Sequence, residues 1–168
     1  MTHVALSIGA NLGDREANIF FMERELYQLL ADAKSSPLME TEPVGVDGPQ
    51  PPYLNRIITG YYDGIPHQLL CACFVIELRL GRKREKPKEP RVADVDILLF
   101  GDLEINEETI LHTLVIPHPE IQNRRFCVEG LARIDPSILV PVGGRRKTAG
   151  RLFKNMRADV AAQNISLI

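Results

Sequence analysis

The segment Asp94-Val95-Asp96-Ile97-Leu98-Leu99-Phe100-Gly101 joins two acidic residues to an apolar run with the length of a buried strand. Side chains alternate between the two faces of a strand, so Asp94 and Asp96 are predicted to point the same way, with Cα atoms roughly 6.6 Å apart. Two carboxylates so placed repel each other, and a hard divalent cation such as Mg²⁺ relieves that repulsion. The segment therefore predicts a core strand that carries a metal site.

A strongly basic stretch comes directly before this strand. Six basic side chains stand against two acidic ones, which leaves a local charge of +4 in a chain of net charge −2: Arg82, Lys83, Arg84, Lys86, Lys88 and Arg91 against Glu85 and Glu89. Guanidinium groups bind phosphate oxygens through paired hydrogen bonds, and carboxylates bind the accompanying metal. Each feature alone is also typical of hydrated surface carboxylates or of a solvated loop. Side by side, they favour a site for a metal-bound polyphosphate.

The composition is that of one compact domain. The 168 residues are 45% hydrophobic and 25% charged, so we expect a single domain over residues 1–168. A net charge of −2 provides no general attraction to nucleic acid or to an anionic membrane, and neither is expected as a partner. The three cysteines fit no disulfide framework and no usual zinc site. The first residues lack a signal-peptide pattern, and a cytoplasmic location is expected.

The order of the periodic segments predicts an α+β fold. Strands are expected at 4–8, 38–42 and 53–62, and a helix is expected at 15–33 after the capping residue Asp14. Pro66 begins a second helix that Gly81 ends. With the strand at Asp94, this is the order of a ferredoxin-like βαββαβ core, an antiparallel sheet with helices packed on one face.

The last third of the chain is predicted to be a C-terminal extension of that core. Residues 103–105 are expected to pair after a turn, residues 123–134 to form a helix, and residues 148–162 to form a final helix. The segment 43–52 is rich in proline and glycine, and we expect a surface loop there.

Four segments occur in one order along the first 140 residues. They are I-G-A-N-L-G-D at 8–14, T-E-P-V-G at 41–45 with P-Y-L-N at 52–55, the basic stretch and acidic strand at 81–101, and I-P-H at 116–118 with N-R-R-F at 123–126. Together they resemble the 6-hydroxymethyl-7,8-dihydropterin pyrophosphokinases of folate biosynthesis, and several agreeing motifs are far more specific than one. The ferredoxin-like core is also the fold that this resemblance implies.

The resemblance implies transfer of the β,γ-pyrophosphoryl group of ATP to the hydroxymethyl oxygen of the pterin, with release of AMP. Asp94 and Asp96 then hold two Mg²⁺ ions, and Arg82 and Arg91 complete the catalytic set. The residues implied to bind ATP are Leu70, Glu77, Arg82, Arg84, Arg91, Ile97, His118 and Arg124. Some have a plainer interpretation: Arg82 and Arg84 as solvated loop residues, His118 as a turn histidine, and Arg124 as a helix cap or surface ion-pair partner.

A pterin is a flat ring with polar edges, which requires aromatic faces and amide groups in its pocket. The residues implied to bind it are Thr41, Pro43, Val44, Tyr53, Asn55 and Phe126. An aromatic residue at a helix start, such as Phe126, more often belongs to the core, and Glu77 fits a plain ion pair with Arg82 or Arg84. Asn55 is unusual, because an amide within an apolar strand needs hydrogen-bonding partners. The family's basic loop commonly carries a tryptophan, and this chain contains none, so weaker loop closure over the pterin is expected.

Two other classes of function stay open at this stage. A different Asp-x-Asp transferase would hold a metal beneath a nucleotide sugar, but such domains usually exceed 168 residues. A non-catalytic ferredoxin-like module would bind RNA or a small ligand, although an RNA-binding sheet normally displays aromatic residues and the strand at 4–8 has none. The resemblance also suggests a functional link to dihydropteroate synthase.

Overall fold

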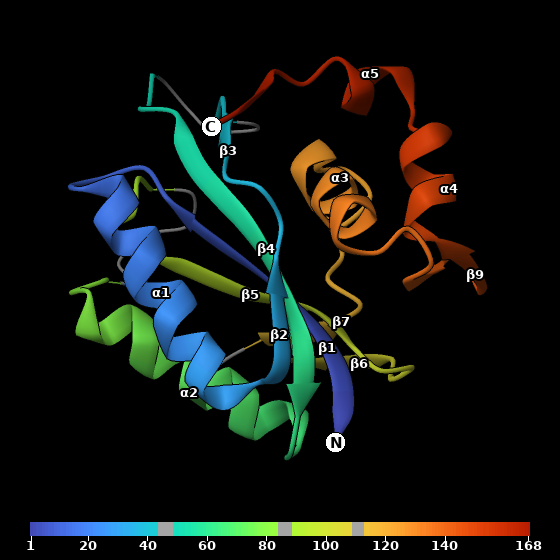
Figure 1. Ribbon diagram of the computed structural model, residues 1–168, viewed down its shortest axis with the longest axis horizontal. Coiled ribbons are helices and arrows are strands. Elements are labelled where there is room, and N and C mark those ends of the chain that lie inside the picture. The colour runs from blue at the N-terminus through green and yellow to red at the C-terminus, as the bar shows by residue number, and fades with distance from the viewer. Residues whose placement is uncertain (44–48, 84–88, 109–112) are drawn as a thin grey trace.

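The computed structural model describes residues 1–43, 49–83, 89–108 and 113–168, and its centre is one antiparallel sheet (Figure 1). β1 (Thr2–Ala10) lies between β4 (Tyr53–Tyr62) and β5 (Asp94–Phe100). β2 (Ala31–Ser35) and β3 (Met39–Thr41) both pair with the far side of β4. The strand order is that of a ferredoxin-like core, so this prediction is confirmed.

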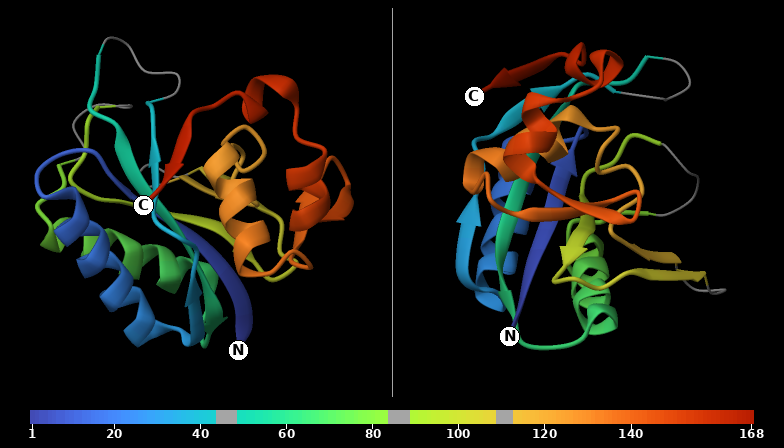
Figure 2. Two further views of the ribbon diagram at one scale, coloured as in Figure 1. Left: turned by 45° about the horizontal axis from the view of Figure 1, so that its top comes forward. Right: turned by 90° about the vertical axis from the view of Figure 1, so that its right-hand side faces the viewer.

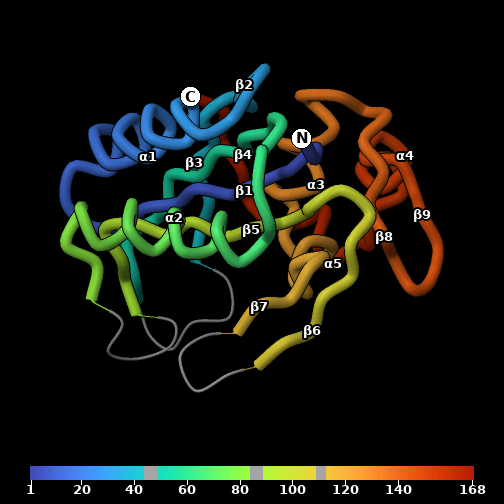
Figure 3. The backbone as a smooth tube through the Cα atoms, turned by 90° about the horizontal axis from the view of Figure 1, so that it is seen from below, coloured from blue at the N-terminus to red at the C-terminus, as the bar shows by residue number. Residues whose placement is uncertain are grey.

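Helices cover both faces of this sheet (Figures 1 and 3). α1 (Arg15–Leu29) and α2 (Pro66–Arg79) lie on one face, and α3 (Arg125–Ile134) packs on the other. Two hydrophobic cores result: the first lies between the sheet and α1 and α2, and the second lies between the sheet and α3. Leu6 of β1 belongs to the first core and the adjacent Ala5 to the second. Both helices of the βαββαβ core thus lie on one face, as predicted, and α3 of the C-terminal extension covers the other. The central strands are apolar on both sides, and each apolar face must be covered.

The first helix ends four residues earlier than expected. Asp14 caps it as predicted, because its carboxylate accepts a backbone N–H of the first turn at 3.0 Å. The helix stops at Leu29, and residues 31–35 form β2 along the edge of β4. Asp32 has a positive φ of 50°, outside the helical region. Strand pairing thus overrode the helical spacing at this end.

The other central elements lie where the sequence predicted them. β4 has the predicted bounds, β5 begins at Asp94, and α2 begins at Pro66. Gly81 follows α2 with φ 80°, a left-handed conformation that glycine adopts readily at the end of a helix. These elements have strong periodicity and clear end signals, which is why their positions were predictable.

The C-terminal third contains more short elements than the sequence indicated. The strand expected at 103–105 is instead a hairpin of β6 (Ile105–Glu108) and β7 (Thr113–Ile116), which extends away from the sheet in Figure 3. A second hairpin, β8 (Leu139–Val142) and β9 (Arg145–Thr148), follows α3, which begins two residues later than expected. The sequence carries no alternation strong enough to reveal these short strands.

The single helix expected at 148–162 was wrong. α4 (Ala149–Lys154) and α5 (Ala158–Ala161) are separate, and the chain then runs to the far edge of the sheet, where β10 (Ile165–Leu167) pairs with β3. Asn155 ends α4 by donating its side-chain amide to a backbone carbonyl of the last turn at 2.8 Å.

Within the described ranges, no helix is long and apolar enough to cross a bilayer.

Candidate active site

Five residues from three neighbouring strands lie on the face of the sheet that α3 covers. Asn55 of β4 lies beside Gly9 of β1, and Gly9 lies beside Asp94 of β5. Two residues along the same strands, Ser7 lies beside Asp96, so both aspartates point to this face. The end of β1 thus brings an amide and two carboxylates onto one surface.

Asp94 is held between two arginines. Arg82 Nη1 lies 2.6 Å and Arg91 Nη1 lies 3.0 Å from Asp94 Oδ1. Burial alone would raise the pKa of this carboxyl, but the charges of Arg91 and Arg82 outweigh burial and hold the pKa below its usual range. Asp94 is therefore ionised at neutral pH, and two predicted phosphate ligands converge on it.

Glu77 fixes the inner arginine. Its side chain is only 2% exposed, and its Oε1 accepts the backbone N–H of Val95 at 2.8 Å while it also contacts Arg82 Nη1. β5 is an edge strand of the sheet, and the outward N–H groups of an edge strand need acceptors. The plainer interpretation of Glu77, an ion pair with Arg82, is what the structure shows.

Asp96 has weaker partners than Asp94. Arg124 Nη1 lies 3.4 Å and His118 Nε2 lies 3.8 Å from Asp96 Oδ2. Burial, and then the charge of Asp94, raise the pKa of Asp96 to about 7. One carboxylate is thus compensated by arginine, and the other is short of positive charge.

His118 is held at the outer edge of β5. Its backbone N–H donates to Leu98 O at 3.0 Å, and its Nδ1 accepts the backbone N–H of Glu120 at 3.1 Å. Burial, and then the charge of Arg124, lower the pKa of His118 to about 4. The ring is therefore neutral at pH 7, and because Nδ1 is an acceptor, Nε2 carries the hydrogen that faces Asp96.

A cavity of about 600 Å³ lies between α2, β5 and β7. It is lined by Leu70, Phe74, Glu77, Leu78, Arg82, Val95, Asp96, Ile97, Thr113, Leu114, Val115, His118 and Pro119. Five of the residues predicted to bind ATP are among them: Leu70, Glu77, Arg82, Ile97 and His118. Most of the lining residues are apolar, and Glu77, Arg82, Asp96 and His118 add charged or polar groups. The size and this mixed lining fit a ligand that has both a ring and anionic groups.

The donor set of the acid pair fits Mg²⁺. This ion binds oxygen ligands and usually takes one or two carboxylates, with water and phosphate oxygens completing its shell. Asp94 and Asp96 supply two such carboxylates on one face of β5. Asp96 in particular is short of positive charge, which a divalent cation supplies.

Asn55, one of the residues predicted to bind a pterin, is hydrogen-bonded to another of them, Thr41. Its Nδ2 donates to Thr41 Oγ1 at 2.7 Å, and both side chains are buried. Tyr53 is half-buried, which raises the pKa of its hydroxyl, and it interacts with Arg91. Phe126, in the first turn of α3, is also half-buried and packs against the second core. Phe126 therefore contributes to the hydrophobic core, as the plainer interpretation predicted.

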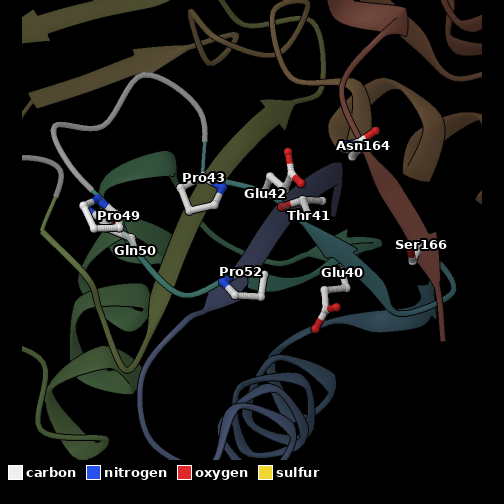
Figure 4. A pocket seen from close by; sticks show the side chains of 9 residues that line it. All are labelled: Glu40, Thr41, Glu42, Pro43, Pro49, Gln50, Pro52, Asn164 and Ser166. Atoms are coloured by element: carbon white, nitrogen blue, oxygen red, sulfur yellow. The ribbon is translucent and has the colours of Figure 1, made fainter.

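A second cavity, of about 620 Å³, lies beside β3. Figure 4 shows its lining residues: Glu40, Thr41, Glu42, Pro43, Pro49, Gln50, Pro52, Asn164 and Ser166. Of the predicted pterin residues that the structure describes, Thr41 and Pro43 line this cavity, and Tyr53, Asn55 and Phe126 do not. Two further predicted site residues, Val44 and Arg84, lie outside the described residues.

Asn11 joins three segments at the site, although residue patterns alone do not reveal this role. It is 2% exposed, and its Oδ1 accepts the Arg91 N–H at 2.7 Å. Its Nδ2 donates to Pro51 O at 3.2 Å, and its own backbone N–H donates to Arg91 O at 3.0 Å. Arg91 and the end of the proline-rich loop are thereby tied to the end of β1. The available signal was the G-A-N-L-G motif that contains Asn11.

Comparisons with known proteins show the family of this chain. A profile of the family described as 7,8-dihydro-6-hydroxymethylpterin-pyrophosphokinase (HPPK) matches residues 5–136. The 2-amino-4-hydroxy-6-hydroxymethyldihydropteridine pyrophosphokinase of Aquifex aeolicus is 32% identical over 142 residues, which is 84% of this chain and 86% of that protein. The protein of the same name from Bacillus subtilis is 37% identical over 137 residues, 80% of this chain and 79% of that protein.

A solved structure, Plasmodium falciparum HPPK-DHPS wild type with SDX-DHP, has the same fold. It superimposes with a TM-score of 0.69 at 14% sequence identity and covers 91% of this chain. The chain spans 44% of that longer protein.

Proposed function

Because the chain belongs to the 7,8-dihydro-6-hydroxymethylpterin-pyrophosphokinase family and is a pyrophosphokinase of folate biosynthesis, we propose that Asp94, Asp96 and the arginines around them carry out its reaction. Pyrophosphate passes from ATP to 6-hydroxymethyl-7,8-dihydropterin, and AMP and the pterin diphosphate are released. One observation carries the assignment: the two carboxylates share one face, contact three arginines, and adjoin a cavity of about 600 Å³.

ATP is proposed to lie in this cavity. Its adenine packs against the apolar wall that includes Leu70 and Ile97, and its triphosphate extends toward Arg82 and His118. Arg91 and Arg124 reach the phosphates from either side of the acid pair, and Arg84 is proposed to join them. Guanidinium groups suit this role because they keep their charge and form paired hydrogen bonds to phosphate oxygens.

Two Mg²⁺ ions are proposed to bind Asp94 and Asp96. When bound, they neutralise triphosphate charge and lower the pKa of the pterin hydroxyl. The arginines hold the phosphate chain in line with that hydroxyl, and the half-buried carboxylates fix the positions of the metal ions. Phosphoryl transfer depends mostly on positioning and charge neutralisation, so this site needs no separate protein base.

The pterin is proposed to bind over Asn55, with Tyr53 and Phe126 against its two faces. Thr41, Pro43 and Val44 are proposed to contact its edge. Asn55 already donates one hydrogen bond to Thr41, and its remaining polar atoms can read the amide-like edge of the pterin. A flat ring between aromatic faces with amide groups at its rim is a common arrangement for such ligands.

Replacing Gly9 with alanine is expected to weaken pterin binding selectively. A Cβ atom at Gly9 would lie 2.7 Å from Asn55 Oδ1, so the Asn55 side chain must move. Overpacking of this kind costs about 1–3 kcal/mol, and we expect the KM for pterin to rise about tenfold while the KM for ATP stays within about twofold. Steady-state kinetics with each substrate varied measure this. An unchanged KM for pterin would contradict the proposed place of Asn55.

The proposed reaction is tested by AMP formation. Purified protein is incubated with MgATP, with and without 6-hydroxymethyl-7,8-dihydropterin, and AMP and pterin diphosphate are measured. We expect both products in equal amounts, and only when pterin is present. ATP consumption that does not depend on pterin would indicate another acceptor.

Mg²⁺ binding is expected to strengthen with pH up to about 7. Asp96 must lose its proton to bind the metal, and its pKa of about 7 lies above the ordinary value of 3.8, so proton and metal compete below pH 7. Affinity is expected to rise about tenfold per pH unit below 7 and to level off above it. Calorimetric titration with MgCl₂ measures this without nucleotide, whose phosphates titrate in the same range. Asp96→Asn serves as the control without a titrating group, and a flat profile in the unaltered protein contradicts the prediction.

The two alternative function classes are not favoured, because the family match extends over residues 5–136. A functional link to dihydropteroate synthase remains a proposal, supported by relatives such as the Chlamydia caviae protein named folate synthesis bifunctional protein. The proposal treats residues 1–168 as one domain, and the cytoplasmic location stays a prediction.

A further inference from the structure

The C-terminal segment returns to the site after α5. β10 pairs with β3 so that Ile165 lies opposite Thr41, and the N–H of Ile168 donates to Leu38 O at 3.0 Å. Figure 2 shows this segment passing from α5 to the edge of the sheet at β3. It lies beyond the residues that the family profile matches, 5–136.

Gln163, just before β10, contacts the backbone on both sides of Arg124. Its Oε1 accepts the N–H of Arg125 at 2.9 Å, and its Nε2 donates to the carbonyl of Asn123 at 2.7 Å. Arg125 binds back, because its Nη1 donates to the carbonyls of Gln163 at 3.1 Å and of Ala161 at 2.9 Å. The two peptide units that flank Arg124 are therefore fixed from outside α3.

The start of α3 needs such a partner. The first N–H groups of a helix have no acceptor within the helix. Arg124 is the N-cap residue, and a guanidinium has no acceptor atom to offer them. Its side chain instead reaches Asp96, at 3.4 Å. Gln163 supplies the acceptor to Arg125 and leaves the Arg124 side chain available to the site.

We propose that Gln163 is a positioning residue that holds Arg124 opposite Asp96, and this rests on the proposed function, in which Arg124 binds the triphosphate. The amide acts on the backbone and does not touch the substrates. A small displacement matters, because a group misplaced by about 1 Å can cost about 100-fold in rate.

The test compares Gln163→Ala with Gln122→Ala. Gln122 is an exposed amide in the turn before α3. We expect Gln163→Ala to lower kcat/KM for ATP about tenfold and to weaken binding of a non-hydrolysable ATP analogue, measured by calorimetry with Mg²⁺. Gln122→Ala is expected to change neither quantity by more than about twofold. Unchanged kinetics and analogue binding in Gln163→Ala overturn the proposal.

A double-mutant cycle separates positioning from a merely structural role. If Gln163 acts through Arg124, the variant with both Gln163→Ala and Arg124→Ala is no slower than Arg124→Ala alone. Independent effects that multiply overturn the proposal, even if Gln163→Ala is slow. If Gln163→Ala does not fold, the cycle is run with Gln163→Glu, which keeps the acceptor for Arg125 and loses the donor to Asn123. Unaltered protein that forms no AMP counts against the proposed function, whereas active protein with an additive cycle counts only against this inference.

Discussion

Replacing Asp96 with alanine is expected to lower pterin-dependent AMP formation at least about 1000-fold, because it removes half of the carboxylate pair proposed to hold Mg²⁺. Metal ions stabilise the charge of the transition state of phosphoryl transfer by several kcal/mol. Each 1.36 kcal/mol corresponds to about a factor of ten in rate. The measurement is AMP produced per enzyme at saturating MgATP and pterin. Activity close to that of the unaltered protein would remove the proposed metal site.

The fold is expected to survive this change. The pKa of Asp96 is raised to about 7 in the folded protein, so the stability linked to this group is present at low pH and is lost as pH rises through 7. At about pH 8 the ionised carboxylate disfavours folding, and Asp96→Ala is expected to unfold at no lower temperature than the unaltered protein. Asp102→Ala is the matched control, because Asp102 follows the same strand and its side chain is 68% exposed. It is expected to keep full activity.

Replacing Arg82 with alanine is expected to lower both activity and stability. Its guanidinium contacts Glu77 and lies 2.6 Å from Asp94, and the Arg82 side chain is 11% exposed. Breaking a buried ion pair from one side typically costs about 3–5 kcal/mol, and loss of one charge-stabilising donor costs about 100- to 1000-fold in rate. AMP formation and the midpoint of chemical denaturation measure the two effects.

Arg145→Ala is the matched control for Arg82→Ala. Arg145 is an exposed arginine in β9, on a hairpin remote from the acid pair, and its loss is expected to change activity by less than about twofold. Arg82→Lys keeps the charge but not the planar fork, so only partial recovery is expected. If Arg82→Ala were less stable but equally fast in the folded state, Arg82 would be an ion-pair partner only.

Local patterns accounted for the framework of this protein. Alternation placed Asp94 and Asp96 on one face of β5, and Pro66 and Gly81 marked the ends of α2. Local patterns did not predict the segments whose structure depends on strand pairing with distant parts of the chain. Residues 31–33 were expected to continue the first helix but belong to β2, which pairs with β4. β10 has no alternation that reveals its pairing with β3.

The amino-acid sequence by itself therefore determined the ferredoxin-like core, the acid pair beside its basic loop, and the family, because these features depend on residues close together in the chain. Only the tertiary structure decided how the charges are distributed at the site. Asn11 meets Arg91 across 80 positions, and Gln163 meets Asn123 across 40. Such contacts depend on how the layers of the fold pack against each other. The same packing places two arginines close to Asp94 and leaves Asp96 with a more distant one.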